Sequence, residues 1–287
     1  NGSEYLRKVK KQGPVMDSVI FIDECSMIDR ELMKWIEKET YNSKVVFIGD
    51  HCQLPPVKEK VMPAFNNLNN DKAELNSVIR NKDEPALQAL CNQLRNTVLT
   101  GSFDPIKIVP GVVDLFDDET LQEFIKTEFE DQHHNNKIVA YSNRRVNQFN
   151  SYIRTDVRGL SNDFNIGETL LCNTYVKNED TAIAIGIDEV VSIDNKINTT
   201  IACPTGDIIE CTQFTISNGK RSVKGYLPNE PSKYKKMLKH FSNEKNWRMY
   251  FQYKDLLLDL RPQDASTIHK SQGSTYDTVI VDVGDIN

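Results

Sequence analysis

Several features that mark common classes of protein are missing from this 287-residue chain. Its six cysteines form no Cys-x-x-Cys pair, and no histidine lies at zinc-finger spacing from them, so a zinc site is not expected. The longest apolar runs, such as Val45-Val46-Phe47-Ile48, are far shorter than the roughly 20 residues of a membrane span. The first residues carry no signal-peptide pattern. Scattered unpaired thiols are typical of a reducing, intracellular setting.

A large excess of one charge is also missing. The chain has 35 Lys and Arg against 41 Asp and Glu, which gives a net charge of −6. This balance argues against a general basic surface, but a local groove could still hold nucleic acid, because screening limits each charge to about 10 Å. Apolar residues make up 39% and charged residues 26%, as in soluble proteins with packed cores. The length allows about two domains.

What is present is an alternation of apolar strands and amphipathic helices. The run Val19-Ile20-Phe21-Ile22 ends in two carboxylates, which is typical of a strand buried on both faces of a parallel sheet. A helix over 32–36 and a second buried strand at 45–48 complete a βαβ unit. Asp83 is a plausible helix N-cap. Further helices are predicted over 4–11, 83–99, 119–130 and 144–158, and further strands at 138–141 and 278–281.

Residues 160–262 interrupt this alternation. Short alternating stretches, with Asn218-Gly219 as a turn, indicate a small β-barrel-like insertion that also holds a basic amphipathic helix near 232–245. We therefore expect an α/β chain in three parts. These are the C-terminal part of a first domain at 1–80, a second domain at 81–159 and 263–287, and the β-rich insertion at 160–262.

Polar side chains follow the first two predicted strands where each strand ends. Asp23-Glu24 ends the first, and Gly49-Asp50 followed by Gln53 ends the second. Parallel sheets bind ligands at this edge. Such a pair suits nucleotide hydrolysis, in which the Asp holds Mg²⁺, the Glu polarises water and the Gln senses the γ-phosphate. Taken alone, Asp23-Glu24 could equally be a solvated strand end.

The two segments together resemble motifs II and III of superfamily 1 helicases, in the branch of RecD-like and Dda-like enzymes. Glu74-Leu75-Asn76-Ser77-Val78-Ile79-Arg80-Asn81 is similar to motif IV, which implies that Arg80 reaches the γ-phosphate. Ala265 to Thr275, with Thr267-Ile268-His269-Lys270, is similar to motif V. The resemblance covers 19–158 and 263–283 and is weak over 160–262.

The resemblance also implies DNA contacts. Asn143 and Arg144 belong to a loop that touches the DNA backbone in the family, although a helix cap and a solvated arginine are the structural alternatives. Hydroxyl, amide and cationic groups suit phosphates and carry no base code. The residues expected on DNA phosphates are Thr267, His269 and Lys270, while Gln272 and Gly273 are expected nearer the nucleotide; a packed core position is the alternative for His269.

The resemblance implies an ATP-dependent DNA helicase. Its fold would consist of two RecA-like P-loop NTPase domains, the first of them incomplete, with an SH3-like insertion in the second. It would be a monomer that uses ATP and Mg²⁺ and moves 5′ to 3′ on single-stranded DNA, with a replication or recombination protein as a further partner and no membrane. The setting would be a bacterium, a phage-infected cell or a nucleus. No Gly-x-x-x-x-Gly-Lys-Ser/Thr loop and no motif VI occur. We therefore expect a fragment that hydrolyses ATP poorly on its own.

Two other functions remain open. One is a catalytically dead helicase-like module that binds nucleic acid or a replication partner, and the other is an RNA helicase of the same superfamily. The basic segment 220–248, with interleaved Tyr226, Tyr234, Phe241 and Trp247, could support single-stranded DNA. Its structural alternative is an amphipathic helix with a solvated face and an aromatic core side.

Overall fold

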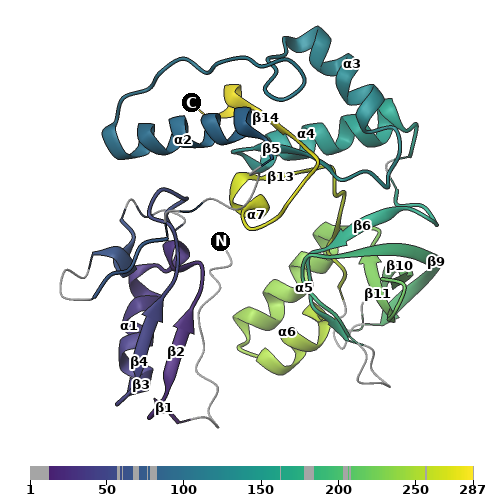
Figure 1. The fold of residues 1–287 in the computed structure, drawn as a ribbon. Helices are drawn as coiled ribbons and strands as arrows, with labels where there is room; N and C mark the ends of the chain where they lie inside the picture. Colours follow the sequence, from purple (N-terminus) through teal and green to yellow (C-terminus); the bar gives the residue numbers. More distant parts are fainter. Residues whose placement is uncertain are drawn as a thin grey trace. The chain divides into compact units, whose positions relative to one another are not determined.

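The protein divides into two compact units, residues 1–115 and 116–287. The computed structural model describes residues 13–56, 59, 61–66, 71–75, 77, 83–161, 163–177, 184–202, 206, 208–255 and 257–286. The predicted helix over 4–11 lies outside these residues. Figure 1 shows the mixture of helices and strands that the alternation predicts. Among the described residues, no helix is both long enough and apolar enough to span a membrane.

The first unit is built on short parallel strands. Strand β2 (Val19–Ile22) pairs with β4 (Lys44–Phe47), and β1 (Val15–Met16) pairs with β3 (Thr40–Tyr41). Helix α1 (Arg30–Glu39) connects β2 to β3 after the short turn η1 (Cys25–Met27) and is capped by Asp29. The predicted βαβ unit is therefore confirmed.

The expectation that both strands are buried on both faces is wrong. Val19 is 59% exposed and Phe21 is 67% exposed, and Val46 on the neighbouring strand and Ile48 just after that strand are exposed as well. The side chains alternate between exposed and half-buried, because only one face of this sheet is covered within the described residues. A continuous apolar run gives no information about which face a neighbouring layer covers.

Helix α2 (Pro85–Thr100) follows in the first unit, after the short turn η2 (Pro63–Phe65). Its N-cap is Glu84, with no side-chain cap bond, so the predicted cap at Asp83 is one residue early. The unit boundary at 115 also counts α2 with the first unit, whereas we expected the second domain to begin at residue 81.

The second unit contains a three-stranded parallel sheet. The central strand β5 (Asn136–Ala140) is buried from Lys137 to Ala140 and lies between β13 (Ala265–Thr267) and β14 (Thr278–Val281). Ala140 is paired with Thr267, so these two strands end side by side. Helices α3 (Asp118–Glu128) and α4 (Asn143–Tyr152), with a π-helical turn at Ile153–Val157, contribute to the core around Ile138 and Phe129.

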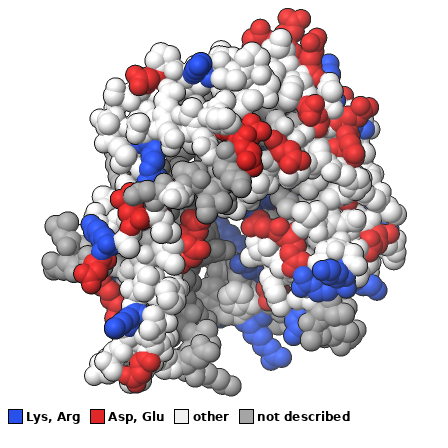
Figure 2. All heavy atoms as spheres, in the orientation of Figure 1, with Lys and Arg blue, Asp and Glu red and all other residues white. Residues whose placement is uncertain are grey.

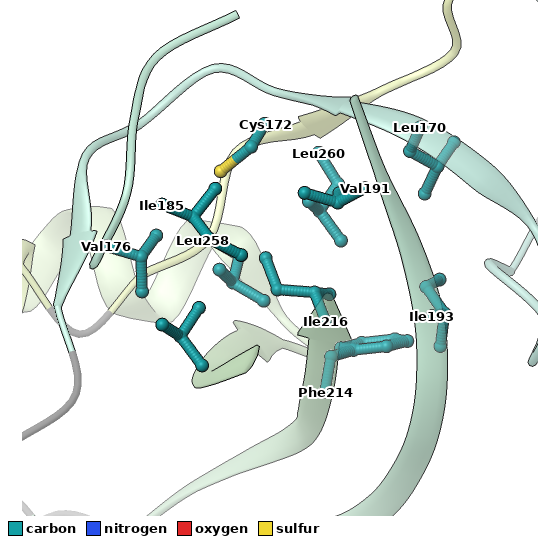
Figure 3. Close-up of a cluster of buried hydrophobic side chains, with 11 residues drawn as sticks. Leu170, Cys172, Val176, Ile185, Val191, Ile193, Phe214, Ile216, Leu258 and Leu260 are labelled. Carbon is teal, nitrogen blue, oxygen red and sulfur yellow. The ribbon is translucent and has the colours of Figure 1, made fainter. Parts of the chain in front are cut away.

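Between α4 and β13 the chain forms a five-stranded antiparallel sheet in the order β11-β10-β9-β6-β12. Its inner face carries an apolar cluster that includes Leu170, Val191, Phe214 and Ile216 (Figure 3). In the described residues this sheet is open, with β11 and β12 as its edges, and no closed barrel is formed. The strands are β6 (Thr169–Cys172), β9 (Glu189–Ala202), β10 (Ile208–Ser217), β11 (Ser222–Pro228) and β12 (Leu260–Arg261), with a separate hairpin β7 (Val176–Lys177) and β8 (Ala184–Ile185).

Two helices follow β11. Helix α5 (Pro231–Asn243) is the predicted basic amphipathic helix, and α6 (Trp247–Lys254) packs against it. Tyr234 and Phe241 are buried, as the core-side alternative for this segment proposed. After β13 come the one-turn helix α7 (Ile268–Ser271) and, beyond β14, the turn η4 (Val283–Asp285).

Candidate functional site

In the first unit, the two acidic residues of the predicted motif lie immediately after β2. Asp23 and Glu24 are both exposed, and the Glu24 amide donates a 2.9 Å hydrogen bond to the Asp23 side chain. Glu24 has a left-handed backbone (φ 51°, ψ 42°), an uncommon conformation for a residue other than glycine. The chain therefore turns sharply at the strand end, so that consecutive carboxylates remain in solvent while the next two residues are buried.

The end of β4 lies directly against this turn. The Ile48 amide donates to the Ile22 carbonyl at 2.8 Å, and the Cys25 amide donates to the Ile48 carbonyl at 2.9 Å. A Cβ at Gly49 would lie 2.7 Å from Cys25 Sγ and 3.0 Å from the Cys25 amide nitrogen, so no larger residue fits without a shift. Burial raises the pKa of the Cys25 thiol, which stays neutral.

Beside Cys25, the hydroxyl of Ser26 is fully buried and has no hydrogen-bond partner among the described residues. Buried hydroxyls are normally satisfied, and an orphaned one is common where a ligand completes the site. Mg²⁺ binds one or two carboxylates and keeps several waters, so the exposed Asp23 and Glu24 beside this hydroxyl fit such an ion with its nucleotide.

The loop after β4 is held by an ion pair that the sequence did not indicate. Arg95 on α2 donates through Nη1 to both carboxylate oxygens of Asp50 at 2.8 Å, and the Cys52 amide donates to the same carboxylate at 3.0 Å. Burial would raise the pKa of Asp50, but the Cys52 and Arg95 hydrogen bonds outweigh it and lower that pKa. Asp50 thus stays ionised and fixes the start of the loop, whose Gln53 amide donates to the Asp50 carbonyl.

Other predicted residues of this site are placed as follows. Gln53 is exposed at the end of the loop. Asp50, His51 and Cys52 bring one ligand atom each to within 4.8 Å of one another, but a cation there would have to displace the Arg95 guanidinium. Arg80, the expected γ-phosphate contact, lies outside the described residues.

In the second unit, the predicted DNA residues gather after β5 and β13. Asn143 and Arg144 are exposed in the first turn of α4, whose N-cap Ser142 accepts from the Arg145 amide at 3.2 Å. The Asp285 carboxylate accepts hydrogen bonds from the Ser142 amide at 2.6 Å and from the Ser142 hydroxyl at 2.9 Å, and these bonds lower the pKa of Asp285. The neighbouring Arg145 is instead committed to an ion pair with Asp282 at 2.5 Å.

Lys270, the cation expected on a DNA phosphate, already has two partners. Its Nζ lies 2.6 Å from Asp188 Oδ1 and 2.5 Å from Asn173 Oδ1, both in the β-rich insertion. The two side chains of the ion pair are 40% and 56% exposed, so the pair is open to solvent and to competing anions. Thr267 caps α7 by position, and His269 on that helix is half-buried.

The last two predicted nucleotide-site residues lie just past these. Gln272 is half-buried at the end of α7, and the exposed Gly273 follows it with a left-handed backbone. They belong to the same unit as Lys270, while Asp23, Glu24 and Gln53 belong to the other unit. The structure thus brings the predicted residues together in two groups, one in each unit.

The opposite, amino-terminal edge of the β5 sheet carries a buried charge network. Asp264 is fully buried, and its carboxylate accepts hydrogen bonds from Arg158 Nη2 at 2.6 Å and Nη1 at 3.0 Å. It also lies 3.0 Å from His134 Nε2. Lys137 donates to the Gln263 carbonyl, and burial lowers its pKa. These side chains lie at the opposite end of β13 and β5 from Thr267 and Asn143, where they hold the start of β13.

Arg95, Asp188, Asn173 and the Asp264 network were all missed by sequence reasoning. The two residues of each interaction are 45 or more residues apart in the chain, except for the Arg158–His134 contact. No sequence motif contains both residues of such a pair. The one available signal was a carboxylate placed directly before the motif V segment, at Asp264.

Comparisons with known proteins agree with the motifs. A family model described as an AAA domain matches residues 5–103. ATP-dependent DNA helicase dda of Enterobacteria phage T4 is 28% identical over 166 residues, covering 53% of this chain and 36% of that protein. An uncharacterized protein of Acanthamoeba polyphaga mimivirus is 28% identical over 127 residues, covering 42% of this chain and 23% of that protein.

A solved structure of Bacteroides sp Pif1 in complex with ADP-AlF4 overlaps 92% of this chain and 64% of its own, at 17% identity and a TM-score of 0.36. The chain spans about a quarter to a third of the length of the two curated relatives. The match to the AAA domain model covers the residues that carry the motifs after β2 and β4. By these matches the chain is similar to superfamily 1 helicases of the Dda-like branch.

Proposed function

We propose that this chain is part of an ATP-dependent motor that moves along single-stranded DNA, in the 5′ to 3′ direction by analogy within its branch. The single observation that supports it best is the paired strand end of the first unit. There, two exposed carboxylates project beside an orphaned buried hydroxyl, at a junction that Gly49 keeps tight. Carboxylates at the carboxyl edge of a parallel sheet are placed for nucleotide chemistry.

In this proposal each residue has a distinct task. Asp23 holds Mg²⁺, and Glu24 polarises the attacking water. Gln53 contacts the γ-phosphate or that water, and Arg80 neutralises charge on the transferring phosphoryl group. Bound Mg²⁺ supplies positive charge to the phosphate oxygens. Asp50 has a supporting task, because its bond to Arg95 holds the loop that carries Gln53.

The second unit supplies the DNA contacts of the proposed motor. Asn143, Arg144, Thr267, His269 and Lys270 follow two neighbouring parallel strands and so share one edge of the sheet. Gln272 and Gly273 would face the nucleotide. The groups available are amide, hydroxyl and cation, which bind phosphates without reading bases. Binding is therefore expected to be nearly independent of base sequence.

The test of the nucleotide site is Glu24→Gln in the protein at its natural length. Because Glu24 orients water and does not hold phosphate, DNA-stimulated hydrolysis should be lost while nucleotide affinity stays within a few-fold. The matched control is Glu37→Gln, an exposed carboxylate on α1, which should leave both unchanged. Stopped-flow binding of a fluorescent ATP analogue and phosphate release are the measurements. A loss of affinity as large as the loss of rate contradicts the assignment.

The DNA contacts have a separate test. Each neutralised phosphate contributes roughly −0.7 to the slope of log K against log salt for single strands. Lys270→Ala should flatten that slope by about one such contribution. It should also weaken all oligonucleotide sequences alike. Unchanged affinity and slope would remove Lys270 from the site and leave the nucleotide assignment untouched.

A further inference from the structure

Helix α6 has a half-exposed aromatic face, formed by Trp247 and Phe251, whose rings each make an edge contact with Tyr250. Trp247 is 50% exposed and Phe251 is 45% exposed. Together with Lys254 they occur at positions i, i+4 and i+7, so the three side chains share one face of the helix. Arg248 lies at the side of this face and is exposed. Large aromatic side chains are normally buried, and their joint exposure marks an interaction surface.

The other face of α6 fixes the helix in place. Tyr253 is buried and stacks on Phe241 of α5 with ring centroids 5.7 Å apart, and the Tyr234 hydroxyl donates to the Tyr253 carbonyl at 2.6 Å. Asn246 caps the helix by accepting from the Met249 amide at 3.3 Å. Because this side is packed and capped, the exposed rings are presented on a rigid platform.

The surroundings of this face are basic, although the chain as a whole carries a charge of −6. Residues 231–255 contain seven Lys or Arg against two acids, Glu244 and Asp255, which gives +5. Glu244 lies 3.4 Å from His240, and Asp255 is the C-cap of α6. In Figure 2, Lys and Arg gather in the region where Figure 1 draws α5 and α6, whereas Asp and Glu dominate the upper part of the same unit.

We propose that the exposed face of α6 is a second site for single-stranded nucleic acid, in which bases stack on Trp247 and Phe251 while the neighbouring lysines and Arg248 contact phosphates. Positions i and i+4 are about 6 Å apart along a helix, which leaves room for one base on each ring. Aromatic platforms flanked by cations bind single strands without sequence preference. An acidic protein segment would also complement the positive charge, but its carboxylates would not stack on Trp247 and Phe251 as nucleic-acid bases do.

The site goes beyond the proposed motor function, since it needs neither ATP nor Lys270. Trp247 itself reports on it, because the chain has two tryptophans and Trp35→Phe leaves Trp247 alone. The full chain carrying Trp35→Phe is titrated with a deoxythymidine oligomer of about 12 nucleotides. Stacking should quench Trp247 fluorescence, and added salt should weaken the binding. Phe251→Ala should reduce affinity by at least about fivefold, whereas Phe103→Ala, at a still more exposed ring in the first unit, should not.

Inorganic polyphosphate and a poly-glutamate peptide serve as base-free polyanions. The proposal expects the DNA oligomer to quench Trp247 and these two to compete weakly at equal charge. Equal quenching by either polyanion, or DNA binding that leaves Trp247 fluorescence unchanged, would overturn it. Phe251→Tyr keeps a flat ring and should retain affinity, which separates stacking from any loss of folding. Intact DNA-stimulated hydrolysis without quenching overturns this site alone and leaves the proposed motor standing.

Discussion

The two units of this protein differ in how they are stabilised. Among the described residues, the first unit buries two apolar side chains almost completely, Cys25 and Ile28, whereas the second buries 27. The first unit leaves Phe21 and Val19 in solvent, and the shorter of its described ion pairs, Asp50–Arg95, is partly exposed. The second unit adds a fully buried charge network around Asp264 to its three apolar clusters.

The difference shows where each unit can tolerate change. Proposed nucleotide contacts in the first unit lie on exposed strand ends with few supporting layers, so substitutions there should affect chemistry more than stability. In the second unit, buried side chains support the strands that carry the proposed DNA contacts. The two tryptophans, Trp35 in the first unit and Trp247 in the second, allow each unit's unfolding to be followed separately in single-tryptophan variants.

The largest expected effect is on the buried network. Asp264→Ala leaves Arg158 without its carboxylate partner and removes the negative charge that acts on the buried Lys137, and removing one partner of a buried pair typically costs about 3–5 kcal/mol. Asp50→Ala breaks an ion pair of similar length that is partly exposed, and should cost about 1 kcal/mol or less. Urea unfolding followed through Trp247 and Trp35 measures the two losses. Equal losses would contradict the difference between the units.

Removing an apolar side chain should likewise destabilise the second unit more than the first. Ile138→Ala removes a fully buried side chain from the centre of β5 and should destabilise the second unit by about 2–5 kcal/mol. Phe21→Ala removes a larger side chain that is 67% exposed, and should change stability by about 0.5 kcal/mol or less. Thermal unfolding of both variants provides the test. A large loss at Phe21 would mean that this face is covered in solution.

The buried network also predicts an acid limit for the second unit. Burial would raise the pKa of Asp264, but hydrogen bonds from His134 and Arg158 hold it below its ordinary value of 3.8. A depressed pKa contributes stability that is fully present above the ordinary value and is lost as pH falls through the lower folded value. Unfolding of the second unit should therefore become easier below pH 3.8. Asp264→Asn should show a flatter pH dependence in that range.

The smallest expected effect concerns the one proposed DNA contact that is already ion-paired. Asp188→Asn removes the carboxylate partner of Lys270 while keeping a similar shape. Exposed pairs are worth about 0–1 kcal/mol, so single-stranded DNA affinity should rise by up to about fivefold at low salt. Asp194→Asn, on an exposed residue of β9, is the control. Fluorescence anisotropy measures both. A fall in affinity would show that Asp188 orients Lys270 for DNA.

Much of the fold could be predicted because the local patterns are strong. The strand Val19 to Ile22 and the Asn218-Gly219 turn follow from the apolar pattern and from turn chemistry. The closed barrel could not be judged from alternating stretches, because they specify strands and not whether the edges of a sheet meet. Burial on both faces of β2 was wrong for a related reason, since a layer elsewhere decides it.

The candidate site was predictable only where a residue lies within a motif. Asp23, Glu24 and Lys270 are proposed from their position after a strand or within a segment, and the pairing of the strands explains why the proposed residues of each unit lie near one another. Their partners were not found. Asp188 lies 82 residues before Lys270, and Arg95 lies 45 residues after Asp50. Such pairs depend on how distant segments pack, which no local pattern records.

Glu24 meets two demands at once, because its carboxylate is proposed to act on water and its backbone is left-handed. For an ordinary L-residue this conformation costs roughly 1–2 kcal/mol, and asparagine accepts it more readily than most. The left-handed backbone therefore restricts which residues position 24 accepts, even before the proposed role of the carboxylate is considered. Valine, isoleucine and threonine should be excluded even in a chain selected for folding alone. A library varied at this one codon would return glycine and asparagine when stability is selected, and glutamate when turnover is selected.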